Sequence, residues 1–313
     1  MQEIVESGVT VCEIEVFPGP RARFDAPPDL LIEIPHGATT EKNFRNVRRL
    51  LSGEIPEDLE AFFFINTDVG APECARAVAT LLTRPPGPSS REDLKVLVVK
   101  CLVPRTFVDC NRVLEEPVGE LGESGLTRGL PDYVSDAADI ERLRRLHRAY
   151  QEAVDRSYEL VCGAGGLALA LHTYAPRSVA IDRVDGGIVA ALRQAYEPKR
   201  YHMWPERPAV DIISETLDGV RLAPADLVAS IIEKYRADAI EVSENATYHL
   251  HPASTGHSHS VRFPQQVTCL EIRRDLLADP FIPFAAMHIS PVKVARMASP
   301  IAAALGDRLQ NRS

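Results

Sequence analysis

The sequence predicts a three-layer α/β/α protein, in which helices cover both faces of a mostly parallel, mixed central sheet. Short apolar runs, of the kind that form buried strands, alternate along the chain with longer stretches of helical periodicity. The apolar runs lack strict alternation, which is typical of strands covered on both faces. No internal repeat or linker interrupts this pattern, so we expect a single α/β domain over residues 1–313.

The expected elements follow one another from residue 30 onward. Apolar runs predict strands at residues 30–34, 61–66, 95–101, 166–171, 209–213 and 267–272. Helical spacing of apolar residues predicts helices near residues 75–82, 137–160 and 222–235. The Pro-Pro-Gly-Pro run at residues 85–88 should end the first helix. Residues 115–133, with four glycines and two prolines, are expected to form a long loop.

Composition and charge narrow the functional classes. The net charge of -9 argues against nucleic acid or an anionic membrane as the main partner. No stretch approaches the ~20 apolar residues that span a bilayer, and the acidic N-terminus is unlike a signal peptide. The six cysteines form no Cys-x-x-Cys pair, so we expect buried, reduced thiols in a cytoplasmic protein.

Polar side chains follow the expected strands, where open α/β sheets bind their ligands. They are His36, Asp68, Arg105, Asn111, Arg112, His172 and Glu271. Histidine and carboxylate ligands with a water make a catalytic zinc site, and a further carboxylate can take a proton from that water. Arginine can bind a substrate carboxylate in a bidentate way. The set therefore contains the parts for metal-assisted hydrolysis of an acidic substrate.

The three candidate ligands also have ordinary structural interpretations. His36 could cap the turn after its strand, Asp68 could be the N-cap of the next helix, and His172 could be a hydrogen-bonded core histidine.

The other charged residues have structural alternatives as well. Arg105 and Arg112 could be ion-pair partners, and Glu271 could pair with Arg273 or Arg274. The hydrolase interpretation is favoured because all of these residues are expected at the same end of one sheet.

Several segments, taken together, resemble the N-formylglutamate amidohydrolase family over roughly residues 30 to 280. The matching segments are Pro35-His36-Gly37, Thr67-Asp68, Pro104-Arg105, Asp109-Cys110-Asn111-Arg112, His172-Thr173-Tyr174-Ala175-Pro176, Asn245-Ala246-Thr247-Tyr248 and Glu271-Ile272-Arg273-Arg274-Asp275-Leu276. The Asp-x-Asn-Arg and Glu-Ile-Arg-x-Asp-Leu segments are the most specific.

This family is similar to zinc carboxypeptidases, so the resemblance implies a zinc-exopeptidase-like fold with one Zn²⁺ ion. It implies His36, His172 and Asp68 as ligands and Glu271 as the general base. It further implies that the substrate carboxylate or scissile carbonyl contacts Arg105, Asn111, Arg112 and Tyr248. A late histidine would donate a hydrogen bond to the tetrahedral intermediate; His259 fits by its spacing, and His257 is its rival.

The sequence also departs from this pattern. Carboxypeptidases place a glutamate three residues after the first histidine, and this chain has Thr39 there. Either Asp68 or Glu41 must then supply the third ligand. The changes at Pro104 and Thr247 lie around the expected pocket and concern the substrate.

Three functions remain open from the sequence. The resemblance implies hydrolysis of N-formyl-L-glutamate to formate and glutamate. The alternatives are a related zinc hydrolase that acts on another N-acyl amino acid or a small peptide, and a metal-free binding protein of the same fold. The His-x-His pair at 257–259 could also bind metal, although we expect its segment to be a loop or lid.

Overall fold

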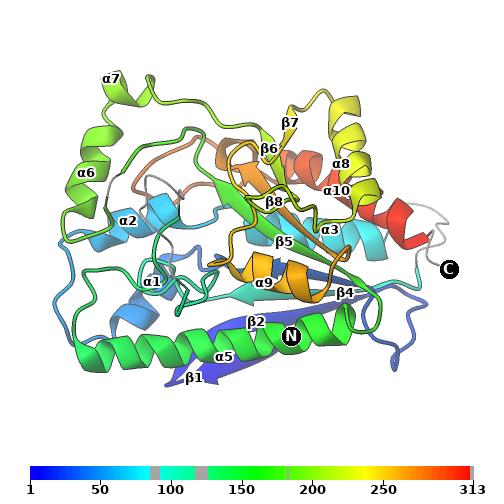
Figure 1. Ribbon diagram of the computed structural model, residues 1–313, viewed down its shortest axis with the longest axis horizontal. Helices are drawn as coiled ribbons and strands as arrows, with labels where there is room; N and C mark the ends of the chain where they lie inside the picture. Colours follow the sequence, from blue (N-terminus) through cyan, green and yellow to red (C-terminus); the bar gives the residue numbers. More distant parts are fainter. Residues whose placement is uncertain (85–91, 117–125, 182, 311–313) are drawn as a thin grey trace.

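The computed structural model describes residues 1–84, 92–116, 126–181 and 183–310. The strands of this part of the chain form one eight-stranded mixed sheet (Figure 1). Its strand order is β1-β2-β4-β3-β5-β8-β6-β7. The strands are β1 (Gln2–Glu6), β2 (Val9–Pro18), β3 (Leu30–Ile34), β4 (Lys95–Cys101), β5 (Leu167–Tyr174), β6 (Val210–Ile213), β7 (Val242–Glu244) and β8 (Val267–Arg273). The central strands β4, β3, β5 and β8 are parallel to one another, and β6 pairs with β8 in the antiparallel direction.

Helices cover both faces of the sheet, so the predicted three-layer α/β/α architecture is confirmed (Figure 1). The helices are α1 (Glu41–Arg48), α2 (Leu59–Asn66), α3 (Ala71–Thr83), α5 (Ala137–Val161), α6 (Ile188–Ala195), α7 (Pro198–Tyr201), α8 (Ala225–Ala237), α9 (Thr255–Arg262) and α10 (Pro291–Gln310), with a 3-10 turn at Arg274–Leu276. Helices α3, α8 and α10 share one apolar core with the sheet, while α1, α2 and α5 share the other.

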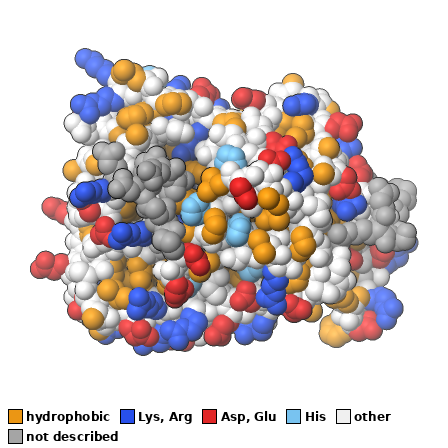
Figure 2. Space-filling view, viewed as in Figure 1, with side chains coloured by type: hydrophobic (Ala, Val, Ile, Leu, Met, Phe, Trp, Pro, Cys, Tyr) orange, Lys and Arg blue, Asp and Glu red, His pale blue; other side chains and the backbone are white. Residues whose placement is uncertain are grey.

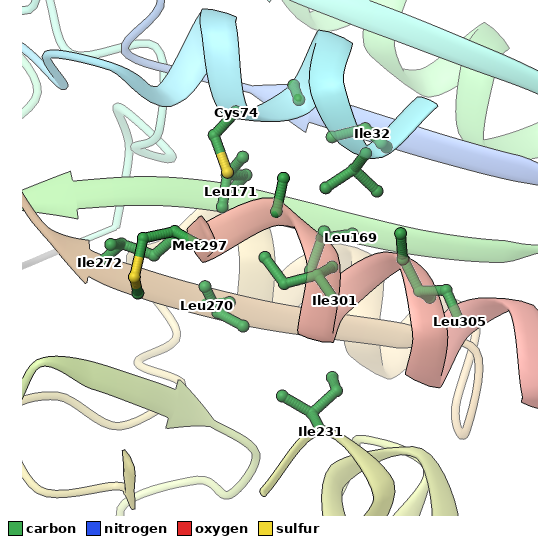
Figure 3. Packing of buried hydrophobic residues seen from close by; sticks show 14 of the residues in the cluster. Ile32, Cys74, Leu169, Leu171, Ile231, Leu270, Ile272, Met297, Ile301 and Leu305 are labelled. Atoms are coloured by element: carbon green, nitrogen blue, oxygen red, sulfur yellow. The ribbon is translucent and has the colours of Figure 1, made fainter. Parts of the chain in front are cut away.

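Alternation along the strands determines which face receives the polar residues. Leu169 and Leu171 of β5 point into the core under α3 and α10, beside Ile272 of β8 (Figure 3). Because successive side chains of a strand point to opposite faces, His172 and Glu271 lie on the other face, which α5 covers. The two are Cα partners in the β5–β8 register. One face of the sheet is therefore covered by an apolar core, and the polar candidate residues His172 and Glu271 lie on the opposite face, near the carboxyl ends of β5 and β8.

Most of the predicted elements agree with the structure. The strands expected at 30–34 and 95–101 coincide with β3 and β4, and the helix expected at 137–160 is α5. The described part of the 115–133 segment contains no helix or strand, whereas residues 85–88 lie outside the described residues.

Two local predictions were wrong. Residues 61–66 are not a strand but belong to α2. The segment expected to be a loop around His257 and His259 is the helix α9, which begins after Ser254, whose hydroxyl accepts from the backbone N–H of His257 at 3.3 Å.

All six cysteines are buried and none forms a disulfide, as the sequence predicted. No helix in the described part of the chain combines the length and apolar character needed to cross a membrane.

Candidate metal centre

Three buried side chains converge at the carboxyl ends of β3 and β5. His36 follows β3, His172 lies near the end of the adjacent β5, and Asp68 follows α2. One carboxylate oxygen of Asp68 lies 3.0 Å from Nδ1 of His172 and 3.4 Å from Nδ1 of His36. The three candidate ligand atoms all lie within 4.8 Å of one another. The structure therefore brings together the three residues that the sequence singled out as metal ligands.

The chain holds Asp68 in place through its backbone neighbours. The hydroxyl of Thr67 donates to the carbonyl of Ala38 at 2.6 Å, and the N–H of Asp68 donates to the carbonyl of His36 at 3.4 Å. The N-cap of α3 is Gly70, with a φ of +83°, and the side chain of Asp68 does not cap that helix. The N-cap interpretation of Asp68 is therefore wrong, and its carboxylate is available to the histidines.

A second buried carboxylate, Asp109, orients the His36 ring. Oδ1 of Asp109 lies 2.7 Å from Nε2 of His36, and Oδ2 accepts from Arg105 at 2.9 Å. Burial alone would raise the pKa of Asp109, but Arg105, Arg112 and His36 hold it well below 3.8. An ionised Asp109 favours a proton on Nε2 of His36, which leaves the lone pair on Nδ1. Among the described residues, this buried Nδ1 has no hydrogen-bond partner.

Replacing Asp109 with asparagine is expected to weaken metal binding at this candidate site about 10–100-fold, with Zn²⁺ as the probe, because His36 then loses its charged orienting partner. Competition with a chromophoric chelator measures this affinity. The matched control is Asp132→Asn, an exposed carboxylate that also pairs with an arginine four residues away. Unchanged zinc affinity in a folded Asp109→Asn variant would contradict the role given to Asp109.

Arg274 supports Asp68 from the other side. Its guanidinium lies 3.8 Å from Oδ1 of Asp68 and donates to the carbonyls of Thr173 and Ile65. Burial alone would raise the pKa of Asp68, but His36 and His172 hold it well below 3.8. Asp68 is therefore a carboxylate at neutral pH, which is the form that binds a metal.

Glu271 lies beside this cluster with one oxygen unengaged. Its Oε2 is buried and has no hydrogen-bond partner among the described residues. Burial raises the pKa of Glu271 from 4.5 to about 7; its electrostatic interaction with His172 opposes the rise, and the negative charge of Asp68 adds to it. Neither Arg273 nor Arg274 forms an ion pair with it in the described structure: Arg273 pairs with Glu206 and Asp275. A carboxylate with this pKa can both accept and return a proton near neutral pH.

The predicted substrate-binding residues have different surroundings. Arg105 contacts Asp109 through one nitrogen, and 22% of its side chain remains exposed. Arg112 is buried and donates to the carbonyls of Thr127 and Asn111, each at 2.9 Å. The Asn111 amide oxygen accepts from the Thr255 hydroxyl at 2.8 Å. Arg112 and Asn111 therefore stabilise the segment that follows β4, whereas Arg105 still has guanidinium N–H groups that could donate to a ligand.

Tyr248 lies beside the charged residues of the site. Its hydroxyl accepts from Arg207 at 3.3 Å, and its ring centroid lies 5.8 Å from the guanidinium carbon of that arginine.

The two histidines of α9 differ in their placement. The His259 ring stacks on Tyr158 of α5 with a centroid separation of 3.8 Å, and burial lowers its pKa to about 4. A carboxylate oxygen of Asp155, also on α5, lies 3.9 Å from its Nδ1. His257 is partly exposed near Asp218. Figure 2 shows histidine side chains near the middle of the face that carries α9. The contacts of His259 thus connect α9 to α5, and those contacts do not include the three candidate ligands.

Glu41, the rival third ligand, lies in the first turn of α1. Its half-exposed side chain pairs with Arg45 one turn later. The carboxylate that reaches both histidines is that of Asp68.

Sequence analysis did not select three residues of this region for a role of their own: Asp109, Arg207 and Arg274. Asp109 and Arg274 lie inside two of the segments that resemble the amidohydrolase family, so the sequence indicated their region but not their roles. Arg207 precedes β6, in a segment that carries no motif, and only the folded chain places it near Glu271.

The donor set fits a zinc ion. Zinc binds imidazole nitrogen and carboxylate oxygen at about 2.0–2.2 Å, so two ligands of a tetrahedral ion lie about 3.3 Å apart. The 3.0 and 3.4 Å separations from Asp68 to the two histidines match this spacing. Three protein ligands leave a fourth position for water, as in catalytic sites.

The fold is shared with proteins of known structure, although the sequence itself matches none of the family models or curated proteins compared. The structure is similar to that of N-formylglutamate amidohydrolase from Ralstonia eutropha JMP134, with a TM-score of 0.54, 14% identity and coverage of 95% of this chain and 97% of that chain. A gene product from Agrobacterium tumefaciens gives a TM-score of 0.53, 17% identity and coverage of 99% of each chain. A metallo-carboxypeptidase from Burkholderia cenocepacia gives a TM-score of 0.44 and 11% identity over 65% of its own length. The chain therefore has the fold of N-formylglutamate amidohydrolase, as its sequence motifs predicted.

Proposed function

We propose that this protein is a zinc-dependent amidohydrolase that cleaves an N-acyl amino acid, with N-formyl-L-glutamate as its substrate. The observation that carries the proposal is the buried His36–Asp68–His172 cluster beside the unengaged oxygen of Glu271. The shared fold with an N-formylglutamate amidohydrolase supports the choice of reaction.

Each residue has a part in the proposed reaction. His36, Asp68 and His172 would hold one zinc ion, which lowers the pKa of a coordinated water to about 7 and polarises the substrate carbonyl. Glu271 takes a proton from the attacking water as the oxygen of that water bonds to the formyl carbon. The C–N bond then breaks, and Glu271 returns the proton to the leaving amine. The products are formate and glutamate, so the atoms of water and substrate are all accounted for.

Arg105 is the residue that we assign to the α-carboxylate of the substrate. Its guanidinium is held by Asp109 yet partly exposed, and its charged neighbours include Asp68 and Glu271. A guanidinium fixed in this way loses little side-chain entropy when a carboxylate binds. Tyr248 would contact the same end of the substrate.

A panel of substrates tests the proposal. Zinc-loaded protein is expected to release formate from N-formyl-L-glutamate with a higher kcat/KM than it shows on N-acetyl-L-glutamate or a small peptide. Coupled detection of formate and of free amine measures the two products separately. Turnover of only the acetyl or peptide substrate would favour the related hydrolase, and no turnover by zinc-loaded protein would contradict the amidohydrolase.

A further inference from the structure

Arg207 lies at the same edge of the sheet as the proposed catalytic residues. It comes shortly before β6, and because β6 is antiparallel to β8, the start of β6 lies at the carboxyl end of β8. The backbone of Arg207 is fixed there by two contacts: its N–H donates to the carbonyl of Pro176 at 2.9 Å, and its carbonyl accepts from Arg273 at 3.2 Å. The segment after β5 and the end of β8 thus both position this arginine.

The guanidinium of Arg207 is oriented by neutral groups. Its Nε donates to the hydroxyl of Ser178 at 2.9 Å, and Nη2 donates to the hydroxyl of Tyr248 at 3.3 Å. It lies over the rings of Tyr174 and Tyr248, at 5.0 and 5.8 Å from their centroids. The Tyr174 ring is itself fixed, because its hydroxyl donates to the carbonyl of Pro208 at 2.7 Å. Tyrosine faces attract the cation and restrict its rotation.

Arg207 differs from the neighbouring Arg105, Arg273 and Arg274 because it has no carboxylate partner among the described residues. Arg105 pairs with Asp109, Arg273 with Glu206 and Asp275, and Arg274 lies against Asp68. No described carboxylate lies within ion-pair distance of Arg207, although its side chain is only partly exposed. A partly desolvated guanidinium held in a fixed orientation is suited to binding an anion from outside the chain.

The groups that Arg207 and Arg105 share as neighbours indicate which anionic group of a ligand Arg207 would bind. Tyr248 accepts a hydrogen bond from Arg207, and it is also among the ionisable groups near Arg105. Glu271 is an electrostatic neighbour of both arginines. The two guanidinium groups therefore both lie near Tyr248 and the proposed general base.

We infer that Arg207 is the specificity-determining residue that binds the side-chain carboxylate of the substrate, while Arg105 binds the α-carboxylate. This inference rests on the proposed function, since it assigns the second carboxylate of the same substrate. It explains why a site with Glu271, Asp68 and Asp109 would accept a dianion: each carboxylate of the ligand meets its own arginine. The ion pair between Arg273 and Glu206, with the hydrogen bond from the Ser178 N–H to the carbonyl of Pro205, holds this segment in place.

The test compares an acidic substrate with its neutral isostere. Wild-type protein is expected to prefer N-formyl-L-glutamate to N-formyl-L-glutamine. The Arg207→Gln variant should lose about 10–100-fold in kcat/KM on the glutamate substrate, since a hydrogen-bonded charge partner is removed, with less than about threefold change on the glutamine substrate. Arg207→Lys should retain part of the preference. The matched control is Arg193→Gln, an arginine that also lies over an aromatic ring, Phe284, but pairs with Asp58, the residue before α2.

Equal losses on both substrates would show that Arg207 only supports the fold of the site, and would overturn the inference. A binding measurement separates this failure from a failure of the proposed reaction. Calorimetric titration of the zinc-loaded protein with glutarate, a dicarboxylate without an amide, should show binding that weakens at least tenfold in Arg207→Gln. Equal glutarate affinity in both proteins, or none in either, would contradict the role of Arg207 even if the amidase assignment holds.

Discussion

Replacing Glu271 with glutamine is expected to lower kcat on N-formyl-L-glutamate by about 10²–10⁴-fold while zinc stays bound. Glutamine has nearly the same shape as glutamate but cannot accept the proton of the attacking water, and general-base catalysis contributes about this much to the rate. Metal content and steady-state kinetics of the same preparation give both quantities. Because Glu271 is not one of the three proposed ligands, zinc occupancy should match that of the wild type.

A carboxylate elsewhere on the sheet provides the control for this variant. Glu244 on the edge strand β7 pairs with Arg221 at 2.5 Å and accepts from Ser214. Glu244→Gln removes a negative charge of the same type without touching the proposed base, so kcat should stay close to that of the wild type. Near-normal turnover in Glu271→Gln would contradict the assignment of the base.

Replacing Asp68 with alanine is expected to weaken zinc binding by more than the 10–100-fold that loss of an orienting group costs, and to abolish turnover. This change removes the only acidic side chain among the three proposed ligands and leaves two histidines. Equilibrium dialysis against buffered zinc measures the affinity, and the unfolding temperature of the metal-free variant shows whether the fold survives. Arg274 loses its carboxylate neighbour in this variant and is left as a buried, uncompensated charge, so a loss of stability is also expected.

The rival ligand supplies the matched comparison. Glu41→Ala should bind zinc like the wild type, because its side chain lies on the exposed side of α1 and pairs with Arg45. The opposite result, in which Glu41→Ala loses zinc and Asp68→Ala keeps it, would show that the third ligand was assigned to the wrong residue.

The strands near the site were predictable because burial on both faces leaves a clear mark on the sequence. The runs that became β3 and β4 contain almost only apolar residues, and each is bounded by polar or turn-forming residues. The apolar run at 61–66 has the same appearance, yet it forms α2. A short apolar run does not distinguish a buried strand from a buried helix, because its periodicity is hidden when every position is apolar.

The first two strands were missed for the opposite reason. Strand β1 lies at the edge of the sheet, where it is mostly exposed, and β2 beside it is only partly buried, so their sequences carry charged residues instead of a continuous apolar run. Only pairing with β4 places β2 in the sheet, and that pairing joins residues about 90 positions apart, such as Cys12 and Cys101.

The metal cluster could be predicted from strand ends and motif order, but the network around it could not. His36 and Asp109 are 73 residues apart, and the contact between them depends on how the loop after β4 folds back. The unpaired state of Arg207 depends on where every neighbouring carboxylate ends up. Such properties belong to the packed structure and leave no local pattern in the chain.

Metal removal followed by restoration tests the central claim, that His36, Asp68 and His172 hold one catalytic zinc ion. Purified protein should contain about one equivalent of zinc, lose both zinc and amidase activity on dialysis against a chelator, and regain activity in proportion to the zinc returned. A His172→Ala variant should neither retain the ion nor recover activity. Full activity in wild-type protein from which the chelator has removed all divalent metal would contradict the account.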